Sequence, residues 1–168
     1  MSKEFLPVVD ENDSVVGKVL RDECHKKGLL HRSVHIFIFN SKGDLLLQMR
    51  SKKMDLYPGF FTSSASGHVS YGETYQEAAE KELAEELGAD IKLELFGKYN
   101  ISSEWDNHFV SLFVGHSDGP FNPDASEVEF VKFCPIPEIK RLMEKEKFSP
   151  NFKACFENYI EGNKGALQ

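Results

Sequence analysis

Three glutamates fall within five residues, with the second and third lying three and four positions after the first: Glu82, Glu85 and Glu86. On a helix, such spacings place side chains on the same side, so the three carboxylates would gather there. Like charges at these spacings destabilise a helix by about 0.2–0.5 kcal/mol per pair, and a bound divalent cation would remove that cost. Mg²⁺ prefers carboxylate oxygens and usually binds substrate phosphates as well. The spacing therefore indicates a magnesium site for a phosphate-bearing substrate, although a solvated acidic helix face also fits the carboxylates alone.

The helix that would carry these glutamates is specified by its own residues over Thr74–Leu87. Thr74 and Glu77 form a capping box at its start, and Gly88 can adopt the left-handed conformation that ends a helix. An apolar stripe at helical spacing should pack against the rest of the fold, and it consists of Ala79, Leu83 and Leu87. The three glutamates lie on a shoulder beside this stripe, which would direct their carboxylates into a groove.

The remaining elements are predicted from runs of β-branched and aromatic residues and from helical periodicity. The strands are expected at Val15–Leu20, Val34–Asn40, Leu45–Met49, Ile91–Phe96, His108–Val114 and Val128–Phe133. Two further helices are expected at Pro137–Lys145 and Phe152–Ile160. Many strands with a few helices predict an α+β domain, in which helices cover a curved mixed sheet.

Length and charge limit the classes of protein to consider. A chain of 168 residues without repeats or linkers fits a single domain over residues 1–168, with a short extension of strand and helix at residues 1–30. The net charge of −7 argues against nucleic acid as the partner. An anionic small molecule would then need a cation or a local basic patch.

The sequence also contains no run of roughly 18 apolar residues that could span a membrane, and its start lacks the apolar core of a signal peptide. We therefore expect a soluble, cytoplasmic protein with no membrane partner, and we leave a homodimer open. Cys24, Cys134 and Cys155 are odd in number and far apart. They fit buried thiols better than a disulfide framework or a zinc knuckle.

The segment Gly67–Gly88 has the pattern G-x5-E-x7-K-E-L-x-E-E-x-G. It resembles the signature of the Nudix hydrolases, in which an arginine stands where this chain has Lys81. The resemblance implies an α/β/α sandwich and a pyrophosphohydrolase that cleaves a nucleoside diphosphate or related small diphosphate substrate with Mg²⁺ or Mn²⁺. It also implies that Glu82, Glu85 and Glu86 are catalytic metal ligands, that Glu82 orients or deprotonates water, and that the Ser66 carbonyl is a further ligand.

A second resemblance extends over roughly residues 8–135, to type 1 isopentenyl diphosphate isomerase, a Nudix subfamily. It rests on His25, His31, Arg50, Tyr57–Gly59 and Thr62–His68. The isomerase has a cysteine where this chain has Ser66, and its two later metal-binding glutamates would fall near Asp106 and His108. Both departures favour hydrolysis over isomerisation, because a hydroxyl is a poor substitute for a thiol as a proton donor.

Two more groups of residues are candidates for the site. Arg50 and Lys53 lie in a local basic patch, and Arg50 aligns with an arginine that contacts diphosphate in the isomerase. We predict that Arg50, Lys53 and His68 bind substrate. Several histidines could form a remnant metal or phosphate site: His25, His31, His35, His68 and His108. Besides hydrolysis and isomerisation, a non-catalytic module that binds a diphosphate or nucleotide stays open.

Overall fold

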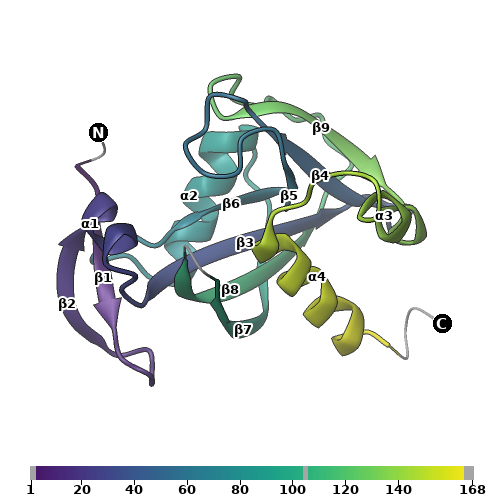
Figure 1. The fold of residues 1–168 in the computed structure, drawn as a ribbon. Helices are drawn as coiled ribbons and strands as arrows, with labels where there is room; N and C mark the ends of the chain where they lie inside the picture. The colour runs from purple at the N-terminus through teal and green to yellow at the C-terminus, as the bar shows by residue number, and fades with distance from the viewer. Residues whose placement is uncertain (1–2, 104–105, 165–168) are drawn as a thin grey trace.

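The computed structural model describes residues 3–103 and 106–164. Its elements follow the chain in the order β1 (Phe5–Val9), β2 (Val15–Leu20), α1 (Arg21–Lys26), β3 (His31–Phe39), β4 (Leu45–Arg50), β5 (Phe61–Thr62), β6 (Ala65–His68), α2 (Tyr75–Leu87), β7 (Glu94–Ser102), β8 (Asn107–His116), β9 (Val128–Cys134), α3 (Ile136–Leu142) and α4 (Pro150–Gly162). Figure 1 shows α2 and α4 on opposite sides of the central strands.

The central sheet is seven-stranded and mixed. Strands β5, β4, β3, β8 and β7 are neighbours in that order, while β6 also pairs with β3 and β9 with β4. The pair β3 and β8 is parallel and the other pairs are antiparallel. Strands β1 and β2 form a separate hairpin, which lies at the N-terminal side of the sheet in Figure 1. This arrangement confirms the expected sandwich of a mixed sheet between helices.

Strand β3 shows how both faces of the sheet are covered. Its side chains alternate between faces, as strand geometry requires. Val34, Ile36 and Ile38 belong to the core beneath α2. Phe37 and Phe39 belong to the core that α3 and α4 complete on the other face. The start of the strand carries polar side chains instead, so this end of the sheet is available for a site.

The hairpin of β3 and β4 is splayed, which opens a gap at that same end. The two strands pair through Phe39 and Leu45 next to the turn. Farther along, β5 pairs with β4 and β6 pairs with β3, so the segment 61–68 lies between them. Ser64 bridges the two strands: its hydroxyl donates to the Leu46 carbonyl (2.6 Å) and accepts from the Ile38 amide (2.9 Å). Residues 61–68 therefore hold the hairpin open.

Most predicted elements are confirmed, but two strands are wrong at their start, and one of them is β3, which begins at His31 instead of Val34. The capping box and the left-handed Gly88 define α2 as expected. The strand predicted at Ile91–Phe96 begins at Glu94 and continues to Ser102. Ile91 and Leu93 instead lie in the connection between α2 and β7 and pack in the core beneath α2. Their apolar side chains are explained by this burial, and they do not form a strand. Helix α3 also begins and ends earlier than predicted, at Ile136 and Leu142.

Two expectations from the sequence concern the state of the cysteines and the presence of membrane-spanning helices. All three cysteines are buried and free, as predicted. Within residues 3–103 and 106–164, the helices are too short or too polar to cross a bilayer.

Candidate active site

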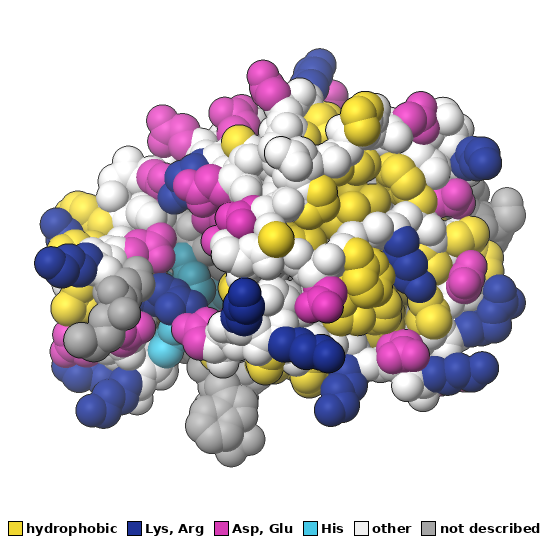
Figure 2. Space-filling model, turned by 90° about the horizontal axis from the view of Figure 1, so that it is seen from above, with side chains coloured by type: hydrophobic (Ala, Val, Ile, Leu, Met, Phe, Trp, Pro, Cys, Tyr) yellow, Lys and Arg dark blue, Asp and Glu magenta, His cyan; other side chains and the backbone are white. Residues whose placement is uncertain are grey.

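A cleft of about 460 Å³ opens at the polar end of the sheet. One part is lined by carboxylates from α2 and the other by histidines from β3, β6 and β8. Figure 2 shows this face of the molecule, with histidine side chains in a hollow beside a group of acidic side chains. The two groups that the sequence singled out therefore share one cleft.

The three glutamates of α2 differ in burial. Glu86 is buried with 2% of its surface exposed, Glu82 is partly buried in the cleft wall, and Glu85 stands exposed at the rim. This difference in burial follows from the position of the glutamates beside the apolar stripe of α2. Leu83 and Leu87 pack one side of the helix against the core, and the opposite side of the helix faces solvent. Glu82 and Glu86 thus face each other inside the protein, and Glu85 completes the set from outside.

Glu86 is held by neutral donors. The Gln48 side-chain amide donates to Glu86 Oε1 at 2.9 Å, and the Ser66 backbone N–H lies 3.3 Å from Oε2. Burial raises the pKa of both Glu82 and Glu86, and the proximity of Glu86 raises the pKa of Glu82 further. No lysine or arginine among the described residues forms an ion pair with either carboxylate. An acidic pair on which Lys81 and Arg50 act only from beyond ion-pair distance is a donor set that fits Mg²⁺ or Mn²⁺.

Lys81, the departure from the family signature, lines the cleft but forms its ion pair with Glu73 and not with Glu82 or Glu86. Its ammonium lies 2.8 Å from Glu73 Oε1, and the Ser70 backbone N–H donates to Glu73 Oε2 at 2.9 Å. The lysine therefore neutralises one oxygen of Glu73 while the backbone binds the other. This arrangement ties the start of the signature to the helix without an ion pair to Glu82, Glu85 or Glu86.

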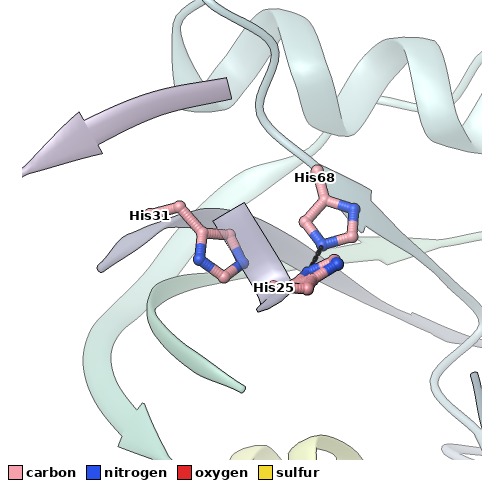
Figure 3. Close-up of side chains that lie close together, drawn as sticks. All are labelled: His25, His31 and His68. Atoms are coloured by element: carbon pink, nitrogen blue, oxygen red, sulfur yellow. Dashed lines mark hydrogen bonds between the residues drawn. The ribbon is translucent and has the colours of Figure 1, made fainter. Parts of the chain in front are cut away.

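The histidines form a second group around one carboxylate. Two sets of three each bring their ligand atoms within 4.8 Å of one another: His25, His31 and His68, and His31, Asp106 and His108. Figure 3 shows the first set, in which α1, β3 and β6 each supply one ring and the Nε2 atoms of His25 and His68 lie 3.1 Å apart. His31 Nε2 lies 3.2 Å from Asp106 Oδ1. Neither of these two atoms is hydrogen bonded within the part of the chain that the structure describes.

The protonation states of this group decide which of its rings can act as metal ligands. Burial lowers the pKa of His25, His68 and His108, so these rings are neutral at neutral pH and can act as ligands. Burial would also lower the pKa of His31, but the Asp106 carboxylate outweighs it and raises that pKa. His31 without a metal is therefore protonated and paired with Asp106, and a metal ion bound there would replace that proton. Imidazoles with one carboxylate suit a transition metal such as Mn²⁺ or Zn²⁺.

Hydrogen bonds fix the orientation of two of these rings. His31 Nδ1 pairs with the Leu29 carbonyl at 2.9 Å, and His108 Nδ1 pairs with the Ser33 hydroxyl at 2.6 Å. In each ring the Nε2 atom is thereby turned toward Asp106. Such contacts are typical of histidines that bind metal.

Two of the three predicted substrate-binding residues line the cleft, and the third does not. Arg50 lines the cleft, and its Nε donates to the Leu56 carbonyl at 2.9 Å, which fixes the guanidinium. His68 also lines the cleft but belongs to the histidine group. Lys53 is exposed and lies outside the cleft lining, so the structure does not bring it to the site. Ser66 lies beside Glu86 in the cleft wall.

Sequence reasoning missed some residues of the cleft. Gln48 is fully buried against Glu86, and Arg21 and Asn151 line the cleft from α1 and α4. A single glutamine in an apolar strand carries no local signal of a site. Arg21 lies in the helix expected within the extension at residues 1–30, but nothing in the sequence indicated that it faces the site, and Asn151 comes from a distant part of the chain.

Residues 29–154 match the model of the NUDIX domain family. The chain belongs to the Nudix family. It is 34% identical over 131 residues to the uncharacterized Nudix hydrolase PA4841 of Pseudomonas aeruginosa, covering 77% of this chain and 78% of that protein. It is also 31% identical over 188 residues to human isopentenyl-diphosphate delta-isomerase 2, covering 94% and 83% of the two chains.

The solved structures agree with this Nudix assignment. DR0079 from Deinococcus radiodurans superposes with a TM-score of 0.79 and 25% identity, covering 92% of this chain and 98% of that chain. Because the relatives include proteins named as hydrolases and as isomerases, membership of the Nudix family leaves the reaction to be argued from the site itself.

Proposed function

We propose that this Nudix protein is a pyrophosphohydrolase that cleaves a nucleoside diphosphate or a related small diphosphate with Mg²⁺ or Mn²⁺. The observation that carries the proposal is the close pair of Glu82 and Glu86, of which Glu86 is buried and neither forms an ion pair with a described lysine or arginine. Burying two carboxylates together costs free energy unless a cation binds between them. Glu85 at the rim supplies the third carboxylate of the set.

The three glutamates and Arg50 have distinct roles in this hydrolysis. Glu82, Glu85 and Glu86 would hold the metal, which when bound neutralises phosphate oxygens and lowers the pKa of water. Glu82 lines the cleft and can orient the attacking water or accept its proton. Water then adds to phosphorus, and the bond from phosphorus to the bridging oxygen breaks. Arg50 would bind the phosphate oxygens that do not react.

The histidine group is assigned a second ion in this proposal. His25, His31, His68, His108 and Asp106 fit a divalent transition metal by donor type and convergence. An ion there would lie in the same cleft as the glutamates, where a second cation could bind the remaining charge of the diphosphate. The acidic protein would thus bind an anion through metals and Arg50.

A substrate screen with matched variants tests the hydrolase. Wild type, Glu85→Gln and Glu86→Gln are assayed with nucleoside diphosphates, dinucleotides, sugar nucleotides and isoprenoid diphosphates in saturating Mg²⁺. We expect turnover of at least one compound and a loss of about 100-fold or more in each variant, because each removes a metal ligand. Unchanged turnover in both variants would contradict the assignment. Tight binding without any turnover would instead favour a non-catalytic binding module.

The second candidate function is isomerisation of an isoprenoid diphosphate. The retained histidine group and the identity to proteins named isopentenyl-diphosphate isomerase favour it. Against it stands Ser66, whose hydroxyl is a much weaker acid than a thiol.

A further inference from the structure

Gln48 is a fully buried polar side chain on β4. Along one face of this strand, Leu46 packs in the core, Gln48 follows it, and Arg50 lines the cleft. Gln48 thus stands where the apolar core ends and the charged site begins. A glutamine is seldom buried this deeply unless its amide is hydrogen bonded.

Both hydrogens of the Gln48 amide are used. Nε2 donates to the Ser64 carbonyl at 3.0 Å and to Glu86 Oε1 at 2.9 Å. Turning the amide over would place its oxygen against these two acceptors, so only one orientation is stable. The Ser64 carbonyl belongs to the segment that holds the hairpin open, which makes it a rigid anchor. Glu86 therefore has one oxygen fixed relative to the sheet.

The chemistry of this partner matters as much as its position. A lysine or arginine at position 48 would neutralise Glu86 and compete with a cation for it. A neutral amide orients the carboxylate and leaves its charge available. Gln48 Oε1 has no hydrogen-bond partner among the residues that the structure describes, so the amide contacts the carboxylate through its N–H group alone.

We infer that Gln48 is the positioning residue for Glu86, holding that carboxylate in place for the metal without neutralising it. The inference rests on the proposed function, since it concerns the metal that hydrolysis uses. Gln48 itself does not line the cleft, and it acts only through Glu86.

The test measures metal affinity as well as turnover. Mn²⁺ is titrated into wild type, Gln48→Met and Glu86→Gln, and the free ion is followed by electron paramagnetic resonance. Gln48→Met keeps the size of the side chain and removes its donors. One Mn²⁺ site should be lost in Glu86→Gln. We expect Gln48→Met to bind Mn²⁺ at this site about 10-fold or more weakly than wild type does. The kcat with Mg²⁺ should fall by a similar factor, while KM stays within about threefold.

A double variant shows whether Gln48 acts through Glu86. Gln48→Met combined with Glu86→Gln should bind and turn over no worse than Glu86→Gln alone, because the shared contact is already lost. Gln48→Asn is the second single variant, whose shorter side chain cannot reach both Ser64 and Glu86. Ile139→Val is the control, since it loosens the core under α3 without touching the cleft.

The outcomes separate the inference from the proposed function. Normal Mn²⁺ affinity and kcat in folded Gln48→Met and Gln48→Asn would overturn the inference and leave the hydrolase standing. A loss of affinity that Ile139→Val reproduces at equal stability would also overturn it. If Glu86→Gln itself changes neither Mn²⁺ binding nor turnover, both the inference and the metal assignment are wrong.

Discussion

The side chain of Glu82 occupies the space that a β carbon on Gly67 would need. Such a carbon would lie 2.7 Å from Cγ of Glu82, closer than real β carbons approach other atoms. Gly67 lies in β6, and its φ is outside the left-handed region, so the glycine is required by the neighbouring carboxylate and not by the backbone. The glycine that opens the Nudix signature thus makes room for one of the glutamates that closes it.

Gly67→Ala should therefore displace Glu82 while the sheet still forms. We expect turnover to fall about 100-fold, as for loss of a metal ligand. Steady-state kinetics and circular dichroism are measured together. Gly17→Ala is the matched control, because its β carbon would meet Val8 at an ordinary 3.6 Å. Equal activity in the two variants would show that Glu82 can leave this place without cost.

Local signals explain why α2 could be predicted almost residue by residue. Thr74, Glu77 and Gly88 act within one turn of the helix ends, and the apolar stripe sets which side packs. The cleft does not depend on local signals of this kind. It depends on the segment 61–68 entering the hairpin of β3 and β4, and the strands of that segment are too short to leave a periodic pattern. Sequence spacing therefore predicted that the glutamates face a groove, but not how β3 and β4 open it.

The convergence of the histidine group could not be predicted from sequence spacing either. His25, His31, His68 and His108 come from four elements, and their convergence is a property of strand order and register. In the parallel pair of β3 and β8, His31 stands opposite His108, and no spacing in the sequence reports this. The resemblance to the isomerase singled out these positions, while the geometry alone shows that Asp106 lies between them.

We expect the histidine group to bind a divalent transition metal. Co²⁺ added to the metal-free protein should give visible absorption bands. His31→Ala should weaken them by removing the ligand that both sets of three share, and Asp106→Asn by removing the carboxylate of one set. His116→Ala is the control, since His116 is exposed at the far end of β8. A spectrum that is the same in all of these proteins would remove the histidines from metal binding.

Wild type should not interconvert isopentenyl and dimethylallyl diphosphates at a meaningful rate. The hydroxyl of Ser66 has a pKa far above that of the thiol it replaces, so it cannot supply or remove the proton on carbon. The reaction is run in deuterium oxide and followed by mass spectrometry. Deuterium entering either compound would establish the isomerase as the activity and contradict this prediction.

Asp13 should stabilise the fold in a pH-dependent way. Its carboxylate accepts from Arg32 at 2.7 Å and from Lys98 and Tyr75 at 2.8 Å each, which ties the first hairpin to the sheet and to α2. Burial alone would raise the pKa of Asp13, but these hydrogen bonds outweigh burial and hold it below its ordinary value of 3.8. The stabilisation is therefore complete above about pH 4 and is lost as the pH falls through the lowered pKa.

Asp13→Asn should lower the free energy of unfolding by about 1–3 kcal/mol at pH 7, because charged partners lose their acceptor. The difference from wild type should narrow below about pH 4, where the native carboxylate also becomes protonated. Urea unfolding of both proteins at pH 7 and at a pH below about 4 measures this difference in stability. Asp90→Asn serves for comparison, since Asp90 is exposed and forms no ion pair among the described residues. A constant difference at all pH values would mean that the charge of Asp13 contributes nothing.

Arg50 should affect substrate affinity more than chemistry. Its Nε is bound to the Leu56 carbonyl, so its terminal nitrogens are free to bind a phosphate in both the ground state and the transition state. Arg50→Ala should raise KM about 10-fold with kcat nearly kept, and Arg50→Lys should recover only part, because an ammonium cannot bind Leu56 and a phosphate as the fork does. Lys53→Ala provides the comparison, since exposed Lys53 should leave KM within about twofold. Steady-state kinetics on the substrate found in the screen decides the matter: a normal KM in Arg50→Ala removes Arg50 from substrate binding, whereas a fall in kcat alone places its contact in the transition state.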